Sequence, residues 1–166
     1  MKVAYGDICG YPALAESGRF KIVNLYESAY ILDKKNKHAI YADDFYGDPS
    51  GAVISSDEKI AVIFGCGLMI CFLKEPYLDY SCNGNPSHWF QWFETGMSED
   101  NKYVDNVNIT DEGHIQVYYE NKSISVITVR HGAFESFTDD DDGVDRNYTR
   151  FKIALRELAE EKKRNK

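Results

Sequence analysis

The chain has 166 residues, of which 43% are hydrophobic and 28% charged. This is the composition of an ordinary globular domain, and it excludes the disordered class. The formal net charge is −8, and it is unevenly divided: residues 1–148 carry 24 Asp and Glu but 12 Lys and Arg, whereas residues 149–166 carry three Glu and seven Lys and Arg. The negative field of the body disfavours nucleic acid as a direct ligand and favours a basic partner.

The compartment is predicted from what the chain lacks. Its first seven residues hold no apolar run that would serve as a signal peptide, and no segment approaches the ~18 apolar residues of a membrane-spanning helix. The four cysteines, Cys9, Cys66, Cys71 and Cys82, form no C-x-x-C pair and no dense disulfide spacing. We therefore expect a cytoplasmic protein with reduced thiols and no membrane association.

Most of the chain predicts strands. β-branched and aromatic residues, punctuated by polar turns, predict strands over residues 20–26, 30–32, 38–42, 52–55, 59–64, 68–73, 103–110, 114–120 and 123–129. Residues 59–64 and 68–73 are apolar at nearly every position, so both of their faces should be covered. Short links between strands predict antiparallel order. The expected fold is mainly β (α+β): an antiparallel meander sheet, or a small sandwich or barrel.

Two features of the strand pattern leave alternatives open. Residues 87–94 fit a short helix capped by Ser87, or a strand. Residues 54–62 resemble residues 108–117, since both are hairpins with an Asp-Glu turn. An ancient duplication, a propeller-like blade repeat and chance similarity between hairpins all fit this likeness.

The end of the chain predicts a loop and a helix. Four consecutive Asp residues begin an exposed acidic loop over residues 139–146, because like charges repel one another and rarely pack. Residues 148–165 predict an amphipathic helix that packs on the sheet. Its apolar stripe consists of Phe151, Ala154, Leu155, Leu158 and Ala159. We expect a single domain over residues 1–166, with a β-rich body over residues 1–138.

The sequence contains no catalytic motif. A calcium loop of the EF-hand kind that began at Asp139 would require Glu at its twelfth position, where Arg150 stands. Cys66 could act as a nucleophile with His88 or His131 as base, but an apolar setting and a negative field both raise a thiol pKa. We expect no catalytic residue, no metal and no cofactor, and an enzyme is the less favoured class.

Acidic residues interleaved with aromatic ones suit contact with a Lys- and Arg-rich surface, because rings supply contact area and carboxylates pair with cations. The alternative for residues 43–48 is a turn-forming Asp cluster with Phe45 in the core. Another alternative is that the aromatic residues near 77–93 are buried. The predicted partner-binding residues are Asp43, Asp44, Tyr46, Asp48, Tyr77, Tyr80, Trp89, Trp92, Asp139, Asp140, Asp141 and Asp142.

Three functional hypotheses follow. The first is a non-enzymatic acidic binding protein that inhibits or sequesters a basic partner protein, such as a toxin or nuclease. In size, acidity and lack of a catalytic motif, the chain resembles the immunity proteins of bacterial toxin systems, although no sequence motif carries this resemblance. The second is a small-ligand-binding or hydrolytic β-fold with an aromatic pocket around residues 77–93. The third is an assembly subunit whose strands at 60–73 form a sheet edge or oligomer interface.

Overall fold

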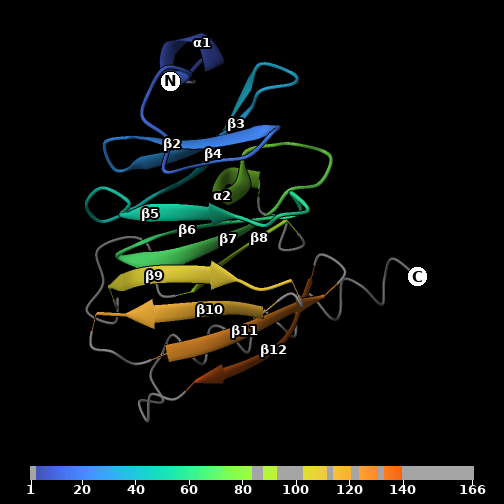
Figure 1. Ribbon diagram of the computed structural model, residues 1–166. Helices are drawn as coiled ribbons and strands as arrows, with labels where there is room; N and C mark the ends of the chain where they lie inside the picture. The colour runs from blue at the N-terminus through green and yellow to red at the C-terminus, as the bar shows by residue number, and fades with distance from the viewer. Residues whose placement is uncertain are drawn as a thin grey trace.

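The computed structural model of the chain describes residues 3–83, 88–92, 103–111, 114–120, 124–130 and 133–139. Its strands form three antiparallel sheets, and the strand order within each sheet follows the chain, so each sheet is a meander (Figure 1). The first sheet contains β1 (Ala15–Glu16), β2 (Phe20–Leu25), β3 (Ser28–Asp33) and β4 (His38–Asp44). The second contains β5 (Gly51–Ile54), β6 (Ile60–Gly65), β7 (Gly67–Phe72) and β8 (Trp89–Trp92). The third contains β9 (Val104–Ile109), β10 (His114–Tyr119), β11 (Ile124–Arg130) and β12 (Ala133–Asp139).

The three sheets are stacked face to face, with the second sheet in the middle (Figure 1). Successive side chains of a strand point to opposite faces, so β6 packs against both the first and the third sheet. Ala61 and Ile63 pack with the first sheet, whereas Val62 and Phe64 pack with the third. This explains why β6 and β7 are apolar throughout. The expected mainly β class and antiparallel order are confirmed, but the strands form three stacked sheets in place of the expected single meander sheet, small sandwich or barrel.

The outer face of the first sheet is covered by the N-terminal segment. Ile8, in the short helix α1 (Tyr5–Ile8), is buried against Val23 and Leu32. Tyr5 and Tyr11 pack at the edge of the same cluster. The first sheet is therefore buried on both faces, as is the second.

The first turn of each sheet is built in the same way. Ser17, Ser55 and Thr110 each donate their backbone N–H to a carbonyl of the returning strand, at 2.8, 2.9 and 2.8 Å. The hydroxyl of each residue in turn accepts a backbone N–H of that strand, at 3.1, 3.0 and 3.1 Å. The similar segments 54–62 and 108–117 are thus the first hairpins of consecutive sheets. Stacked four-stranded meanders are also the blades of β-propellers.

Several local expectations need correction. Residues 89–92 form the strand β8, so the helix alternative is wrong there; pairing with β7 satisfies the backbone groups of this segment. We did not predict β1, α1, α2 (Tyr80–Asn83) or β12. The predicted helix over residues 148–165 and the acidic loop beyond Asp139 lie outside the described residues.

Candidate interaction surface

The meander topology gathers alternate turns at one end of the stack. This end holds the β2–β3 turn, the linker from β4 to β5, the β6–β7 turn, the start of β9 and the end of β10. It lies at the left of Figure 1, where the arrow of β10 ends and that of β9 begins. We call it the tyrosine end, after Tyr26, Tyr46 and Tyr103, which lie there.

Exposed apolar side chains are concentrated at the tyrosine end. Five large hydrophobic residues of the described chain are exposed, and four of them lie at this end: Tyr26 at 79%, Tyr46 at 55%, Tyr103 at 47% and Ile124 at 38%. The fifth, Leu78, lies in the segment that follows β7. Tyrosines are side chains that dominate binding hot spots, and isolated surface hydrophobics do not usually gather in this way.

Cationic residues are unevenly distributed between the two ends of the stack. Exposed carboxylates accompany the tyrosines: Glu27, Asp44, Asp48, Asp105 and Glu120. The Lys and Arg residues of the described chain all lie in or next to the turns of the opposite end, which we call the basic end. They are Arg19, Lys21, Lys34, Lys35, Lys37, Lys59, Lys74 and Arg130. The tyrosine end is therefore acidic among the described residues.

Hydrogen bonds join the tyrosine end across the sheets. In the β2–β3 turn, the backbone O of Glu27 accepts the N–H of Phe45 at 2.8 Å, and its Oε1 accepts that of Gly47 at 3.2 Å. The same linker continues to Ser50, whose hydroxyl is hydrogen-bonded to the Tyr103 hydroxyl before β9. The exposed tyrosines thus belong to one connected surface.

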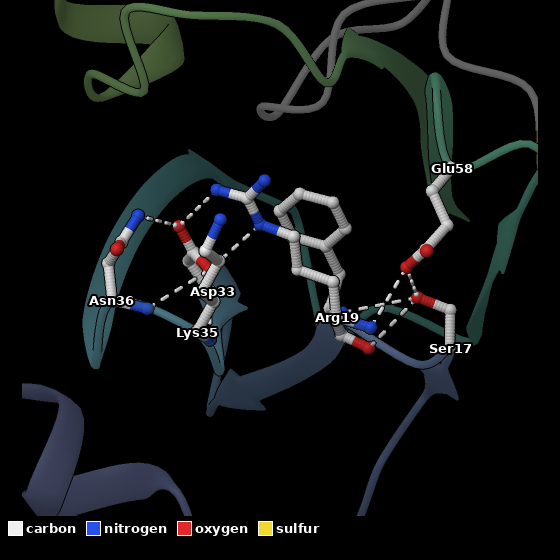
Figure 2. A network of polar contacts seen from close by, with 7 residues as sticks. Ser17, Arg19, Asp33, Lys35, Asn36 and Glu58 are labelled. Atoms are coloured by element: carbon white, nitrogen blue, oxygen red, sulfur yellow. Dashed lines mark hydrogen bonds and ion pairs between the residues drawn. The ribbon is translucent and has the colours of Figure 1, made fainter.

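At the basic end, cations and carboxylates neutralise one another (Figure 2). Arg19 binds Asp33 through Nε and Nη2, at 3.1 and 3.0 Å, and Asn36 Nδ2 donates to the same carboxylate at 2.9 Å. Glu58 Oε2 accepts the Ser17 hydroxyl at 2.5 Å and the Arg19 backbone N–H at 2.9 Å, which ties the first sheet to the second.

These contacts shift the carboxylate pKa values. The Ser17 hydroxyl and the Arg19 N–H lower the pKa of Glu58. Burial alone would raise the pKa of Asp33, but the hydrogen bonds from Arg19 and Asn36 outweigh it, so the pKa of Asp33 is lowered. The basic end is therefore a structural network whose charges are compensated within the fold.

The structure brings three predicted partner-binding residues together at the tyrosine end. Asp44, Tyr46 and Asp48 are exposed there. Asp43 is half-buried, and its carboxylate accepts a hydrogen bond from Gln91 Nε2 of β8. The nearby Phe45 is buried in the core, at 2% exposure. Residues 44–48 thus combine a core anchor with an exposed acidic and aromatic segment.

The predicted aromatic residues near 77–93 lie elsewhere. Tyr80 is 1% exposed, and its hydroxyl donates to the Phe72 carbonyl at 3.0 Å; burial raises the pKa of Tyr80. Tyr77 lies under the Arg19 guanidinium, with 4.9 Å from Cζ to the ring centroid. Trp89 packs at the edge of the core between the first and second sheets. These three residues contribute to packing and lie outside the tyrosine end.

Two further predicted residues are placed by their backbones alone. Trp92 pairs with Leu68 at the start of β7, and Asp139 pairs with Ser125 near the start of β11. Both backbone positions are at the tyrosine end. Residues 140–142 lie outside the described chain.

Tyr26 and Tyr103 were not among the residues predicted from sequence. Tyr26 lies between β2 and β3, and Tyr103 lies just before β9. Only the sheet topology shows that both residues share an end with Tyr46. One signal was available for Tyr26: a large aromatic in the short Tyr26-Glu27 turn of a hairpin has little core to bury it.

The described residues contain no group of three or more His, Cys, Asp or Glu placed to hold a metal ion. Cys71 is buried, and burial raises its thiol pKa well above the ordinary value. No helix in the described ranges is long and apolar enough to span a membrane. Strands β6 and β7 lie inside the second sheet, so neither provides a sheet edge.

The chain matches no model of a known protein family, and no curated protein is significantly similar to it in sequence.

Proposed function

We propose that this protein is a non-enzymatic acidic binding protein that inhibits or sequesters a basic partner protein in the cytoplasm, in the manner of a toxin-immunity protein. The tyrosine end is its binding surface. The observation that carries this proposal is the uneven distribution of cations: at one end exposed tyrosines lie with carboxylates and no Lys or Arg of the described residues, while those Lys and Arg lie among carboxylates at the other end. A cationic partner is attracted to the first end, whereas the charges of the second are compensated within the fold.

The composition of the surface supports protein recognition. Tyr26, Tyr46 and Tyr103 offer rigid rings that supply contact area at low entropic cost, and the surrounding carboxylates supply charge complementarity. The ion pairs seen in the described ranges, Arg19–Asp33 and Lys34–Glu16, are both at the basic end. The carboxylates at the tyrosine end are therefore placed to meet cations from a partner.

The test compares two charge-matched variants. D48K/E120K reverses two exposed carboxylates at the tyrosine end, and E75K/D111K reverses two exposed carboxylates outside it. Tagged wild-type protein and both variants are used to capture partners from the native host at low and moderate salt, followed by mass spectrometry. We expect wild type and E75K/D111K to retain one basic protein that salt weakens, and D48K/E120K to lose it. Association rates with that protein, measured by surface plasmon resonance, should fall about tenfold or more for D48K/E120K alone.

Equal capture by the two variants would contradict the proposal, because they change net charge equally. Both variants should unfold at the same temperature as wild type, since exposed charges contribute little to folding. A large loss of stability in D48K/E120K, with association unchanged, would instead make these carboxylates structural.

We also propose that residues 148–165 form the amphipathic helix predicted from sequence, and that its stripe packs on the outer face of the third sheet. The described part of that face includes Gln116, Tyr118 and Val126, which are half-buried. Replacing Leu155 and Leu158 by Asp should lower the unfolding temperature markedly if the helix packs there. Replacing Arg156 and Glu160, which lie off the stripe, by Ala should change it little.

A further inference from the structure

Tyr26 combines high exposure with an unusual backbone conformation. Its side chain is the most exposed large hydrophobic of the described chain, at 79%, and its φ is +53°. This left-handed region suits glycine or asparagine and is unfavourable for a bulky side chain. Asn24 Nδ2 donates to the Tyr26 carbonyl at 2.9 Å and holds the turn. The ring gains little burial in return, so packing does not explain a tyrosine at this position.

Two acidic residues lie close to this turn along the backbone. Glu27 follows Tyr26 in the turn, and Asp44 is the register partner of Ser28, whose hydroxyl donates to Asp44 Oδ1 at 2.6 Å. Both carboxylates belong to exposed residues. An exposed aromatic residue and two exposed acidic residues thus share one turn and its paired strand end, where the described chain has no Lys or Arg.

The protein itself shows what this combination of groups binds. At the basic end the Arg19 guanidinium lies 4.9 Å from the Tyr77 ring centroid and 5.2 Å from that of Phe20, while Asp33 binds it through two hydrogen bonds. Guanidinium groups stack on aromatic faces and pair with carboxylates in a planar fork, which the ammonium of lysine cannot do. The Tyr26 turn offers the same kinds of groups to a cation from outside.

We propose that Tyr26, Glu27 and Asp44 bind an arginine side chain of the partner, with its guanidinium over the Tyr26 ring and against the carboxylates. This inference rests on the proposed function, and it specifies the chemistry of the partner: an exposed arginine is the group that the tyrosine end recognises. Lysine in the same place would keep the charge attraction but lose the stacking and the forked hydrogen bonds.

The test uses two labelled peptides, one of alternating Arg and Gly and one of alternating Lys and Gly, with binding followed by fluorescence anisotropy at low salt. Y26G removes the ring and suits the left-handed backbone. L78A removes an exposed apolar side chain outside the tyrosine end. We expect wild type and L78A to bind the Arg peptide about fivefold more tightly than the Lys peptide, and Y26G to lose this preference. The unfolding temperature of Y26G should equal or exceed that of wild type.

The outcomes separate the two proposals. If Y26G keeps the Arg preference, or if wild type shows none, the arginine anchor is overturned. If the arginine anchor is overturned but D48K/E120K still loses the basic partner, the proposed function stands without an arginine-binding role for Tyr26. If Y26G and D48K/E120K both bind the peptides and the partner as wild type does, both proposals fail. A clear drop in the unfolding temperature of Y26G would give Tyr26 a folding role and overturn the inference.

Discussion

The Arg19 guanidinium and the Asp33 carboxylate meet in a two-point contact, from Nε to Oδ1 at 3.1 Å and from Nη2 to Oδ2 at 3.0 Å. Asp33 ends β3 and is 1% exposed, whereas the Arg19 side chain is 27% exposed. The Asp33 carboxylate also accepts the backbone N–H of Lys35 at 3.1 Å, so it shapes the β3–β4 turn. One carboxylate therefore joins two turns of the first sheet.

Replacing Asp33 by Ala should reduce the free energy of unfolding by about 2–3 kcal/mol, because it leaves several donors without their acceptor. The loss should lie toward the lower end of the range for buried ion pairs, since Arg19 is partly exposed and can be rehydrated. Urea unfolding monitored by fluorescence measures it. The control is K35A, at an exposed position whose backbone bond to Asp33 is retained. A loss in D33A as small as that in K35A would show that the turn tolerates the missing carboxylate.

Stability should decline in acid. The pKa values of Asp33, Glu16 and Glu58 are lowered in the folded state from 3.8, 4.5 and 4.5. A carboxylate with a lowered pKa stabilises the fold above its unfolded value, and this contribution is lost as pH falls through the folded value. We expect constant stability above about pH 5.5 and a decline below about pH 4.5. Thermal unfolding across pH measures the decline, which should be shallower for D33A than for wild type.

The sequence predicted the strands better than their assembly. Alternation in β10 and the unbroken apolar runs of β6 and β7 indicated strands and two-sided burial, because strand periodicity depends on local residues. It did not predict β12, whose segment mixes Glu, Ser and Thr with aromatics and which pairs with β11 at the sheet edge.

The candidate surface was also predicted only in part, because local sequence patterns do not show how the sheets assemble. Asp44, Tyr46 and Asp48 are neighbours in sequence, so composition alone marked them. Tyr26 and Tyr103 join them only because the linker bonds to Glu27 at one side and to Tyr103 at the other. Tyr80 resembled a surface aromatic by composition, yet tertiary packing buries it. Contacts between sheets decide these placements, and no local pattern records them.

The repeated first turns predict that the hydroxyl of Ser55 is important for folding. Ser55 Oγ accepts the N–H groups of Ile60 at 3.0 Å and Lys59 at 3.2 Å. S55A removes the acceptor of the buried Ile60 N–H, whereas the Lys59 N–H keeps Asp57 Oδ1 at 3.1 Å, and it should lower the free energy of unfolding by about 1–2 kcal/mol. S55T should retain most of it, because Thr110 fills the same role in the third sheet. The exposed Ser56 is the control; equal effects of S55A and S56A would show that the hydroxyl is dispensable.

Gly65 lies where the core meets the tyrosine end. Its replacement by Ala should therefore lower both the stability of the fold and the affinity of the tyrosine end for a peptide. A Cβ at Gly65 would lie 3.1 Å from Ser50 N and 3.3 Å from Pro49 Cα, which are backbone atoms that move only if the linker moves. We expect G65A to lower the free energy of unfolding by about 1–3 kcal/mol. The same linker carries Tyr46, so G65A should also weaken binding of the Arg-Gly peptide.

The control for G65A is G18A, because a Cβ at Gly18 meets no atom within 4 Å. Urea unfolding and peptide anisotropy on the same samples separate the two effects. If G65A lowers stability and leaves peptide binding at the wild-type level, the position of the linker does not govern the binding surface. If binding falls at temperatures where G65A is fully folded, the packing of Gly65 against Ser50 is what places Tyr46 and Asp48 for recognition.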